Sequence, residues 1–148
     1  MKTQLTKKLQ DCLFNYTDKQ GQFGCFEVTI GWFGKERVDY LLYNTNDNWK
    51  CFEIKTTEKD FKSKCAKTFV GNYNYYVMPK ELYYKVKDTI PEEIGVLITT
   101  YYDYGLESIK KAKRQELKVE SKVLFQSMIR SMQRDNARYY KIIQLIKE

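Results

Sequence analysis

Histidine is absent from the sequence of 148 residues, and the four cysteines lie far apart with no CxxC pair. The absence of histidine excludes Ser-His-Asp triads, Cys-His dyads and every zinc site that depends on an imidazole ligand. The cysteines are therefore expected to be reduced, buried thiols rather than metal ligands. Catalytic chemistry is left to carboxylates, lysine, tyrosine or a metal ion held by carboxylates.

Long apolar runs are also missing. No segment approaches the roughly 20 apolar residues that a membrane-spanning helix needs, and the lysines near the N-terminus are not followed by an apolar block. These features predict a cytoplasmic protein with no secretory leader and no membrane partner. The length fits a single domain over residues 1–148, with a core over about residues 1–115 and a basic C-terminal helix over about residues 119–147.

Positive charge is concentrated at the C-terminal end of the chain. Residues 110–148 hold eleven Lys and Arg against four Asp and Glu, which accounts for the whole net charge of +7. Residues 1–109 are balanced at fifteen against fifteen. This distribution favours a polyanionic partner, with nucleic acid ahead of an anionic membrane surface, although a solvated basic face has the same composition.

The first half of the chain predicts one helix followed by three strands. The helix has a Thr3 cap and one apolar face, formed by Leu5, Leu9, Cys12, Leu13 and Tyr16. Three β-rich runs follow at residues 25–33, 37–43 and 49–57, with breaks between them that are short enough for hairpin turns. They predict three consecutive antiparallel strands.

The second half predicts alternating helices and strands. A charged helix is expected at 58–67, a strand at 73–78, a helix at 79–88, strands at 95–101 and about 106–111, and a long helix at about 119–146. The last helix carries one apolar stripe, which consists of Leu124, Met128, Met132, Tyr139, Ile143 and Ile146. The order α-β-β-β-α-β-α-β-(β)-α predicts an α/β fold with a mixed sheet flanked by helices.

The third predicted strand carries an acid and a base on one face. Side chains alternate along a strand, so Glu53 and Lys55 share a side from which Ile54 points away. Asp39 lies early in the preceding strand, fourteen positions before Glu53. Because the start of one antiparallel strand lies beside the end of the next, Asp39 and Glu53 are expected to be neighbours.

Two neighbouring carboxylates repel each other unless a cation lies between them or one of them is protonated. A hard divalent ion such as Mg²⁺ or Mn²⁺ takes oxygen ligands, which Asp39, Glu53, the Ile54 carbonyl and waters would supply. Such an ion polarises a phosphate and activates water, while Lys55 would orient that water or neutralise developing charge. The plain alternative is a half-exposed strand on which Glu53 and Lys55 form a surface pair of little energetic weight.

The segments around these residues also carry a family resemblance. They read RVDYLL at 37–42, CFEIKTT at 51–57, DF at 60–61, NYNYYVMP at 72–79 and IPEEIGVLI at 90–98. Over about residues 25–115 the chain resembles the PD-(D/E)XK nuclease superfamily, and within it the MmcB-like group of DNA-repair proteins and related phage proteins. The resemblance implies a restriction-endonuclease-like α-β-β-β-α-β core in which Asp39 and Glu53 bind the metal ion and Lys55 stands beside the nucleophilic water.

One feature of that superfamily is missing from the first predicted helix. Many members add an acidic ligand there, whereas Asp11 projects away from the apolar face and the segment contains no glutamate. Glu27 or Glu36 would take this place. Glu27 is favoured because it alternates with apolar residues as Glu53 does, although a surface glutamate is the simpler interpretation of either.

Two groups of basic residues are candidates for nucleic-acid binding, because neutralising the phosphate backbone dominates nucleic-acid affinity. One group follows the predicted site and consists of Lys59, Lys62, Lys64 and Lys67. The other forms a stripe on the last helix, opposite its Met128/Met132 side, and consists of Arg130, Arg134, Arg138 and Lys141. A lysine-rich helix that is simply solvated explains the first group equally, and a solvated face or a homodimer contact explains the second.

These patterns and the resemblance together predict a Mg²⁺- or Mn²⁺-dependent DNA nuclease that hydrolyses phosphodiesters in DNA repair, recombination or phage DNA processing. The alternative is a catalytically silent protein on the same fold that binds nucleic acid or another partner. Pairing of two chains into a homodimer is compatible with both interpretations. The substrate form is left open by the sequence.

Overall fold

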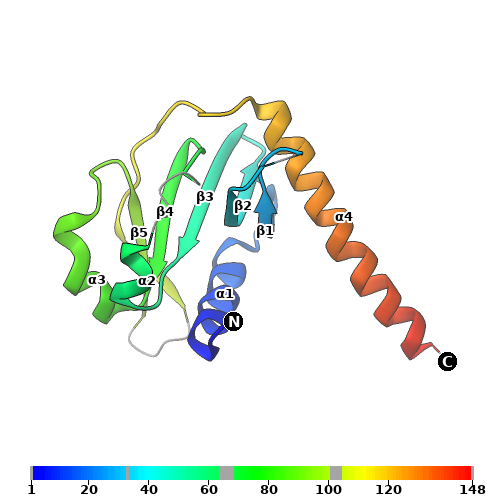
Figure 1. Cartoon of the computed structure of the whole chain (residues 1–148), viewed down its shortest axis with the longest axis horizontal. Coiled ribbons are helices and arrows are strands. Elements are labelled where there is room, and N and C mark those ends of the chain that lie inside the picture. Colours follow the sequence, from blue (N-terminus) through cyan, green and yellow to red (C-terminus); the bar gives the residue numbers. More distant parts are fainter. Residues whose placement is uncertain (1, 33, 64–68, 101–104, 148) are drawn as a thin grey trace.

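The computed structural model describes residues 2–32, 34–63, 69–100 and 105–147. Within these ranges the chain forms four α-helices, a short 3-10 helix and one six-stranded sheet (Figure 1). The helical elements are α1 (Gln4–Thr17), α2 (Glu58–Lys62), α3 (Lys80–Val86), η2 (Lys87–Thr89) and α4 (Ser121–Ile146). The strands are β1 (Gln22–Thr29), β2 (Arg37–Asn44), β3 (Asn48–Ile54), β4 (Tyr73–Met78), β5 (Gly95–Thr99) and β6 (Leu106–Lys110). Among the described helices, none is long and apolar enough to cross a membrane.

The strands lie in the sheet in the order in which they occur in the chain. β1, β2 and β3 are antiparallel to one another, β3, β4 and β5 are parallel, and β6 returns antiparallel to β5. The predicted mixed α/β architecture, the three consecutive antiparallel strands and the order α-β-β-β-α-β are therefore confirmed. β3 ends at Ile54 rather than at residue 57, because Thr57 accepts a hydrogen bond from Asp60 N and caps α2. The expected ends of the 58–67 helix and of the 95–101 strand lie outside the described residues.

α1 covers one face of the sheet. Its buried Leu9 and Leu13 pack in one cluster with Tyr40 of β2, Phe52 of β3 and Val77 of β4. The expected cap is present, since the Thr3 side chain accepts a hydrogen bond from the backbone of the first turn. This helix therefore lies across the middle strands, as its apolar spacing predicts.

The opposite face is covered by α3 and by the first half of α4. Leu82 of α3 and both Leu124 and Met128 of α4 belong to the same buried cluster as Trp49 and Cys51 of β3. Three cysteines of the described chain are free and buried, as predicted, and burial raises the pKa of the Cys51 thiol to about 12. Thiols in such surroundings stay protonated and unreactive.

α4 uses only part of its apolar stripe for this packing. Leu124 and Met128 are buried, whereas Tyr139, Ile143 and Ile146 are 65%, 45% and 75% exposed. Figure 1 shows the reason, because the C-terminal part of α4 extends away from the sheet. The predicted stripe is thus divided into a buried first half and an exposed second half.

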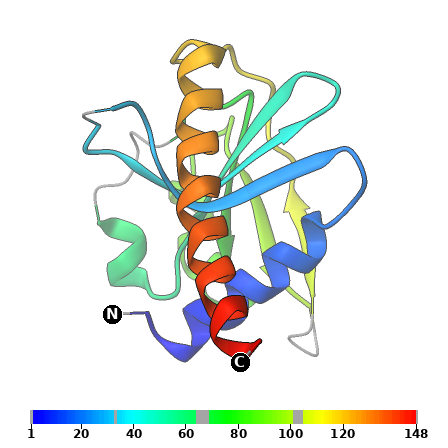
Figure 2. The ribbon, with the colours of Figure 1, turned by 90° about the vertical axis from the view of Figure 1, so that its right-hand side faces the viewer.

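Two arginines of α4 are bound to β1, which is an edge strand, instead of facing solvent. Arg130 donates to the carbonyls of Thr29 and Gly31 at 2.8 and 2.7 Å, and Arg134 donates to those of Glu27 and the residue before it at 3.0 Å each. Figure 2 shows α4 crossing β1 at this place. These bonds give partners to edge carbonyls that would otherwise need water or another strand. Two members of the predicted basic stripe, Arg130 and Arg134, are therefore engaged by the chain itself, and the role of the stripe in nucleic-acid binding stays a prediction.

A glycine in β1 makes room for the tyrosine that ties α1 to the sheet. The Tyr40 hydroxyl lies 2.9 Å from the Thr17 hydroxyl at the end of α1. A Cβ added at Gly24 would overlap that Tyr40 hydroxyl. Any larger side chain at Gly24 must therefore displace Tyr40 and break its bond to Thr17.

Gly24→Ala is expected to lower the free energy of unfolding by about 1 to 3 kcal/mol, since overpacking forces a well-packed side chain out of its place. Urea denaturation measures this difference. Gly105→Ala is the matched control, because a Cβ there meets nothing closer than 3.8 Å. The explanation fails if the two variants unfold at the same urea concentration.

Candidate active site

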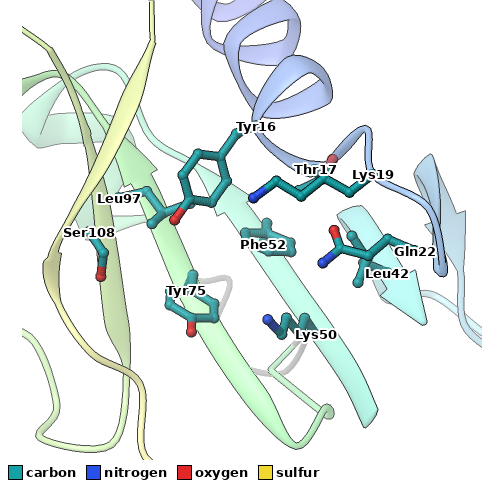
Figure 3. Close-up of a pocket in the computed structure, with 10 residues that line it drawn as sticks. All are labelled: Tyr16, Thr17, Lys19, Gln22, Leu42, Lys50, Phe52, Tyr75, Leu97 and Ser108. Atoms are coloured by element: carbon teal, nitrogen blue, oxygen red, sulfur yellow. The ribbon is translucent and has the colours of Figure 1, made fainter. Parts of the chain in front are cut away.

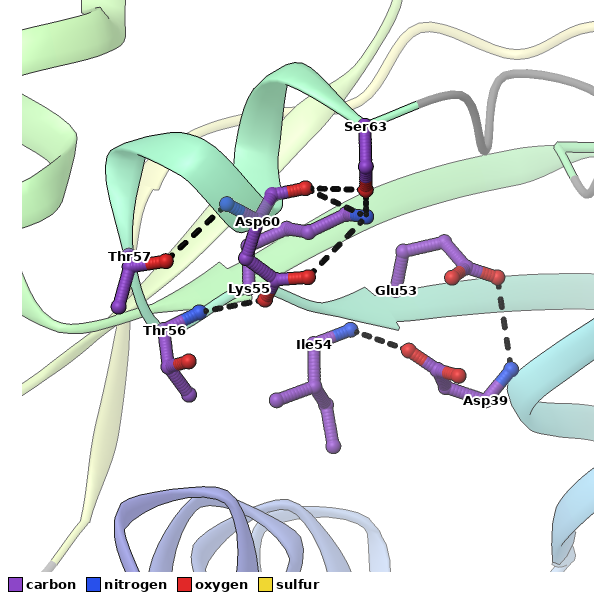
Figure 4. Close-up of polar contacts among 8 residues, drawn as sticks. All are labelled: Asp39, Glu53, Ile54, Lys55, Thr56, Thr57, Asp60 and Ser63. Carbon is purple, nitrogen blue, oxygen red and sulfur yellow. Dashed lines mark hydrogen bonds and ion pairs between the residues drawn. The ribbon is translucent and has the colours of Figure 1, made fainter. Parts of the chain in front are cut away.

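Asp39 and Glu53 lie together at the end of β3, as predicted. β2 and β3 pair with Tyr40 opposite Phe52, and the next step of this register sets Asp39 opposite Glu53. The Ile54 amide donates to Asp39 Oδ2 at 2.8 Å, and the Asp39 amide donates to Glu53 Oε1 at 3.4 Å. Figure 4 shows both carboxylates beside this strand end, with Ile54 directed to the opposite face. The Asp39 carboxylate thus accepts a hydrogen bond from the amide after Glu53, and the Glu53 carboxylate accepts one from the amide of Asp39.

A third carboxylate lies in the same row, on β1. The register of β1 and β2 is continuous except where Glu27 faces Asp39, between the pairs Phe26↔Tyr40 and Val28↔Val38. Glu27 has φ 56°, in the left-handed region that non-glycine residues rarely adopt. Strain of this kind is concentrated at functional sites. Glu27, the favoured candidate for an additional acid, thus has an unusual backbone and lines the same cavity as Asp39, although the described residues do not gather three acids closely enough to hold one ion.

Three cations act on the Glu27 carboxylate. Lys2 Nζ lies 2.8 Å from Glu27 Oε1, and this hydrogen bond lowers the pKa of the carboxyl below its ordinary value. Arg37 and Arg134 act in the same direction through their charge, against the opposite effect of partial burial. Glu27 therefore stays ionised at neutral pH. Glu36, the alternative candidate, does not line the cavity described below.

Lys55 shares a face with Glu53, as the alternation predicts, and both side chains are deeply buried. Glu53 is 2% and Lys55 3% exposed. Lys55 Nζ donates to the Asp60 carbonyl at 3.2 Å and to the Ser63 hydroxyl at 3.4 Å, and it lies 3.9 Å from Asp60 Oδ1 (Figure 4). Asp60 within α2 and Ser63 at its C-terminal end thus fix the position of the ammonium group.

Asp60 links this lysine to the backbone. Its Oδ2 accepts a hydrogen bond from the Thr56 amide at 3.0 Å, while its own amide donates to the Thr57 hydroxyl at 3.0 Å. Asp60 follows the predicted site residues in the sequence, but no role was predicted for it. Its position three residues after Thr57, at the start of a charged helix, is the N-cap pattern that would have indicated a structural role.

These side chains open into one cavity of about 240 Å³. The residues that line it are Lys2, Thr6, Gln10, Glu27, Arg37, Asp39, Glu53, Ile54, Lys55 and Asp60. Gln10 stands on α1, the helix from which an acidic ligand was expected, whereas Asp11 is exposed and takes no part. Sequence reasoning missed Gln10 because its amide has no charge to mark it.

The donor set fits a hard divalent ion. Within the described ranges, no group of three or more His, Cys, Asp and Glu side chains is gathered closely enough to hold a metal ion. Mg²⁺, however, is usually bound by one or two carboxylates and keeps several waters. Asp39, Glu53 and the Ile54 carbonyl are all oxygen donors of that kind, and Asp39 Oδ1 takes no part in the bond from the Ile54 amide. The residues present therefore fit such an ion with two side-chain ligands.

The predicted nucleic-acid contacts are placed unevenly. Lys59 and Lys62 are exposed on α2, beside the cavity residue Asp60, and Lys62 also pairs with Glu58 at 3.4 Å. Lys64 and Lys67 lie outside the described residues. On α4, Arg138 and Lys141 are exposed, in contrast to the two arginines that are bound to β1.

Comparison with known proteins establishes the fold. No protein-family model and no curated protein matches the chain. A solved structure, a protein of unknown function from Silicibacter pomeroyi, superimposes with a TM-score of 0.71 over 97% of this chain and 94% of that one. The two sequences are 17% identical, so the likeness concerns the fold alone.

Relative to Glu27→Gln, which also loses the ion pair with Lys2, Glu27→Gly is expected to have a free energy of unfolding higher by about 1 kcal/mol, because glycine adopts the left-handed conformation without the steric penalty of a Cβ. Thermal unfolding at neutral pH measures the change. Glu27→Gln is the matched control, since it removes the charge and keeps the strain. If glycine proves no more stable than glutamine at this position, the backbone at residue 27 is not strained.

Proposed function

We propose that the chain is a divalent-metal-dependent deoxyribonuclease of the PD-(D/E)XK type, and that its cavity between α1, α2 and the end of β3 hydrolyses a phosphodiester. The observation that carries the proposal is the convergence of Asp39, Glu53 and Lys55 on one cavity. The sequence resemblance and the α-β-β-β-α-β order support it. The buried thiols fit a cytoplasmic place of action, in a bacterium or in the host of a phage.

Each residue of the cavity has a task in this proposal. Asp39, Glu53 and the Ile54 carbonyl would hold Mg²⁺ or Mn²⁺, which when bound polarises the scissile phosphate and favours ionisation of water. Lys55, steadied by α2, orients the attacking water and offsets the charge that develops on the phosphate. In the overall reaction one water is added across one P–O bond.

Further cations are placed to hold the substrate. Arg37 and Lys2 line the same cavity and are available to the charged oxygens of the phosphate. Lys59 and Lys62 lie on the neighbouring α2, where phosphates on either side of the scissile bond would pass. Contacts of this type fix the position of the strand and carry no base preference.

The alternative is a nucleic-acid-binding or partner-binding protein with a catalytically silent site. Two observations favour it: the Lys55 ammonium is already engaged by Asp60 and Ser63, and the described residues gather no third acidic ligand with Asp39 and Glu53. Such a protein would bind DNA in a salt-dependent way. It would neither cleave DNA nor bind the metal ion.

Asp39→Asn and Lys55→Ala are each expected to reduce Mg²⁺- or Mn²⁺-dependent cleavage of supercoiled, branched or single-stranded DNA by about two orders of magnitude or more. EDTA should abolish the cleavage by wild type. Asp11→Asn, which removes an exposed acid of α1 outside the cavity, should cleave at the wild-type rate. Full cleavage by both cavity variants excludes this site.

Metal binding can be measured without DNA cleavage, through its effect on the stability of the protein. Mn²⁺ at a hundredfold excess over its dissociation constant should stabilise the wild type by about 2.7 kcal/mol, because the ion binds the folded state only. Asp39→Asn should lose most of this stabilisation, and Asp11→Asn should keep it. DNA binding without any Mn²⁺ effect on the melting temperature would establish the silent alternative.

A further inference from the structure

The α1 face of the sheet contains a small cavity of about 140 Å³. Its lining includes Tyr16, Lys50, Phe52 and Tyr75 (Figure 3). Phe52 is 2% exposed, and its ring is stacked on that of Tyr75 with centroids 5.2 Å apart. The space is therefore a gap between packed side chains. A much larger apolar surface is exposed on α4.

Besides Phe125, which contacts the Trp49 ring, α4 exposes seven large apolar side chains. Their exposed fractions lie between 45% and 75%, and they are Ile129, Tyr139, Tyr140, Ile142, Ile143, Leu145 and Ile146. All but the first lie in the part of α4 that extends away from the sheet (Figure 1). Together they expose on the order of 800 Å², which is more than the largest apolar patch of a typical monomer and about what one partner contributes to a stable interface.

A seam with regular spacing runs along this surface. Its members follow one another at steps of 3, 4, 3, 4 and 3 residues, and they are Ile129, Met132, Asn136, Tyr139, Ile143 and Ile146. This spacing is the heptad repeat of a coiled coil, with Ile129, Asn136 and Ile143 at position a and the other three at position d. No charged residue interrupts the seam. It is therefore suited to pack against a second helix.

The sheet contacts the opposite side of α4. In the same heptad, Arg130 and Arg134, which bind β1, and Ser127, which accepts a hydrogen bond from the Gly31 amide at 2.9 Å, occupy the outer positions b and f. Among the seam residues, Met132 alone is half-buried, at the side of the core. A second helix can therefore lie along the seam without displacing the sheet.

Asn136 indicates which helix this is. Its side chain is exposed in the middle of the seam, where a purely apolar partner would leave its amide without a hydrogen bond. An amide both donates and accepts, so two copies of Asn136 that face each other in a parallel pair satisfy one another. In an antiparallel pair, position a faces position d, which holds only Met132, Tyr139 and Ile146 in this seam. A single asparagine at position a fixes the register and the number of helices in parallel coiled coils.

We propose that the seam from Ile129 to Ile146 pairs with the same seam of a second copy of this chain, as a parallel two-stranded coiled coil. The two-fold axis runs along the seam, so each seam residue meets its own copy and the two sheets lie on opposite outer sides. One such dimer contains two copies of the candidate active site. The pairing uses none of the residues that line that cavity, so it is independent of whether the cavity hydrolyses DNA.

Sedimentation equilibrium of the full chain at micromolar concentrations tests the pairing. Wild type should have the mass of two chains. Ile143→Asp should raise the dissociation constant of the dimer by about a hundredfold or more, because it buries a carboxylate in the seam of both chains. Ile143 is 45% exposed in the part of α4 beyond the sheet, so the variant should stay folded. Gln144→Asp is the matched control: it brings the same charge to the next residue, which is exposed and outside the seam, and should remain a dimer.

Disulfide cross-linking tests the parallel orientation. Ile143→Cys should form a dimer linked through residue 143 under mild oxidation, because a parallel pair sets the two copies of this residue face to face. Gln144→Cys and wild type, treated in the same way, should not be linked. Equal linking of the two variants, or none at residue 143, would exclude the parallel pair.

Two further results would overturn the proposal: a monomeric wild type, or a dimer that Ile143→Asp does not weaken. A monomer that binds phosphatidylglycerol vesicles, and that loses this binding in Ile143→Asp, would assign the apolar surface to a lipid interface instead. Asp39→Asn should pair as wild type does, whether or not wild type cleaves DNA. Failure of the pairing and failure of the proposed nuclease function are therefore distinguishable.

Discussion

The pairing register of β2 with both of its neighbours is the constraint on which the candidate site depends. This register sets Asp39 opposite Glu27 on one side and opposite Glu53 on the other. A slip of one residue in either pairing would turn one of these acids to the other face of the sheet. The packing of Tyr40, Leu41 and Leu42 into the two cores holds the register, so the apolar part of β2 fixes the geometry of its polar end.

A row of acids on adjoining strands is electrostatically unfavourable, and the surrounding cations offset this repulsion. Around Glu27 they come from three places in the chain: Lys2 before α1, Arg37 at the start of β2, and Arg134 of α4. Two of these three cations lie outside β1, β2 and β3. Most of the charge compensation at Glu27 is therefore a consequence of the tertiary fold.

Local patterns in the sequence were enough to predict most of the fold. Alternation on β3 put Glu53 and Lys55 on one face, short breaks between apolar runs indicated hairpins, and Thr3 marked the start of α1. Contacts over a long sequence distance were not predictable in this way. Nothing local signals that Arg134 reaches the Glu27 carbonyl, 107 residues away, or that the sheet ends before the second half of α4. The apolar residues have the same spacing in both halves of α4. This spacing does not indicate whether another element covers them.

The left-handed backbone of Glu27 follows from such a long-range contact. Arg134 binds the carbonyls of Glu27 and of Phe26 at 3.0 Å, and both can face one guanidinium group only if the strand is bent between them. At this bend β1 changes the face to which its side chains point, so that Phe26 lies with the α1 cluster and Val28 with the opposite core. α4 thereby stabilises a distortion that a regular strand would not adopt. The same distortion brings the Glu27 carboxylate to the cavity, where Asp39 and Glu53 already lie.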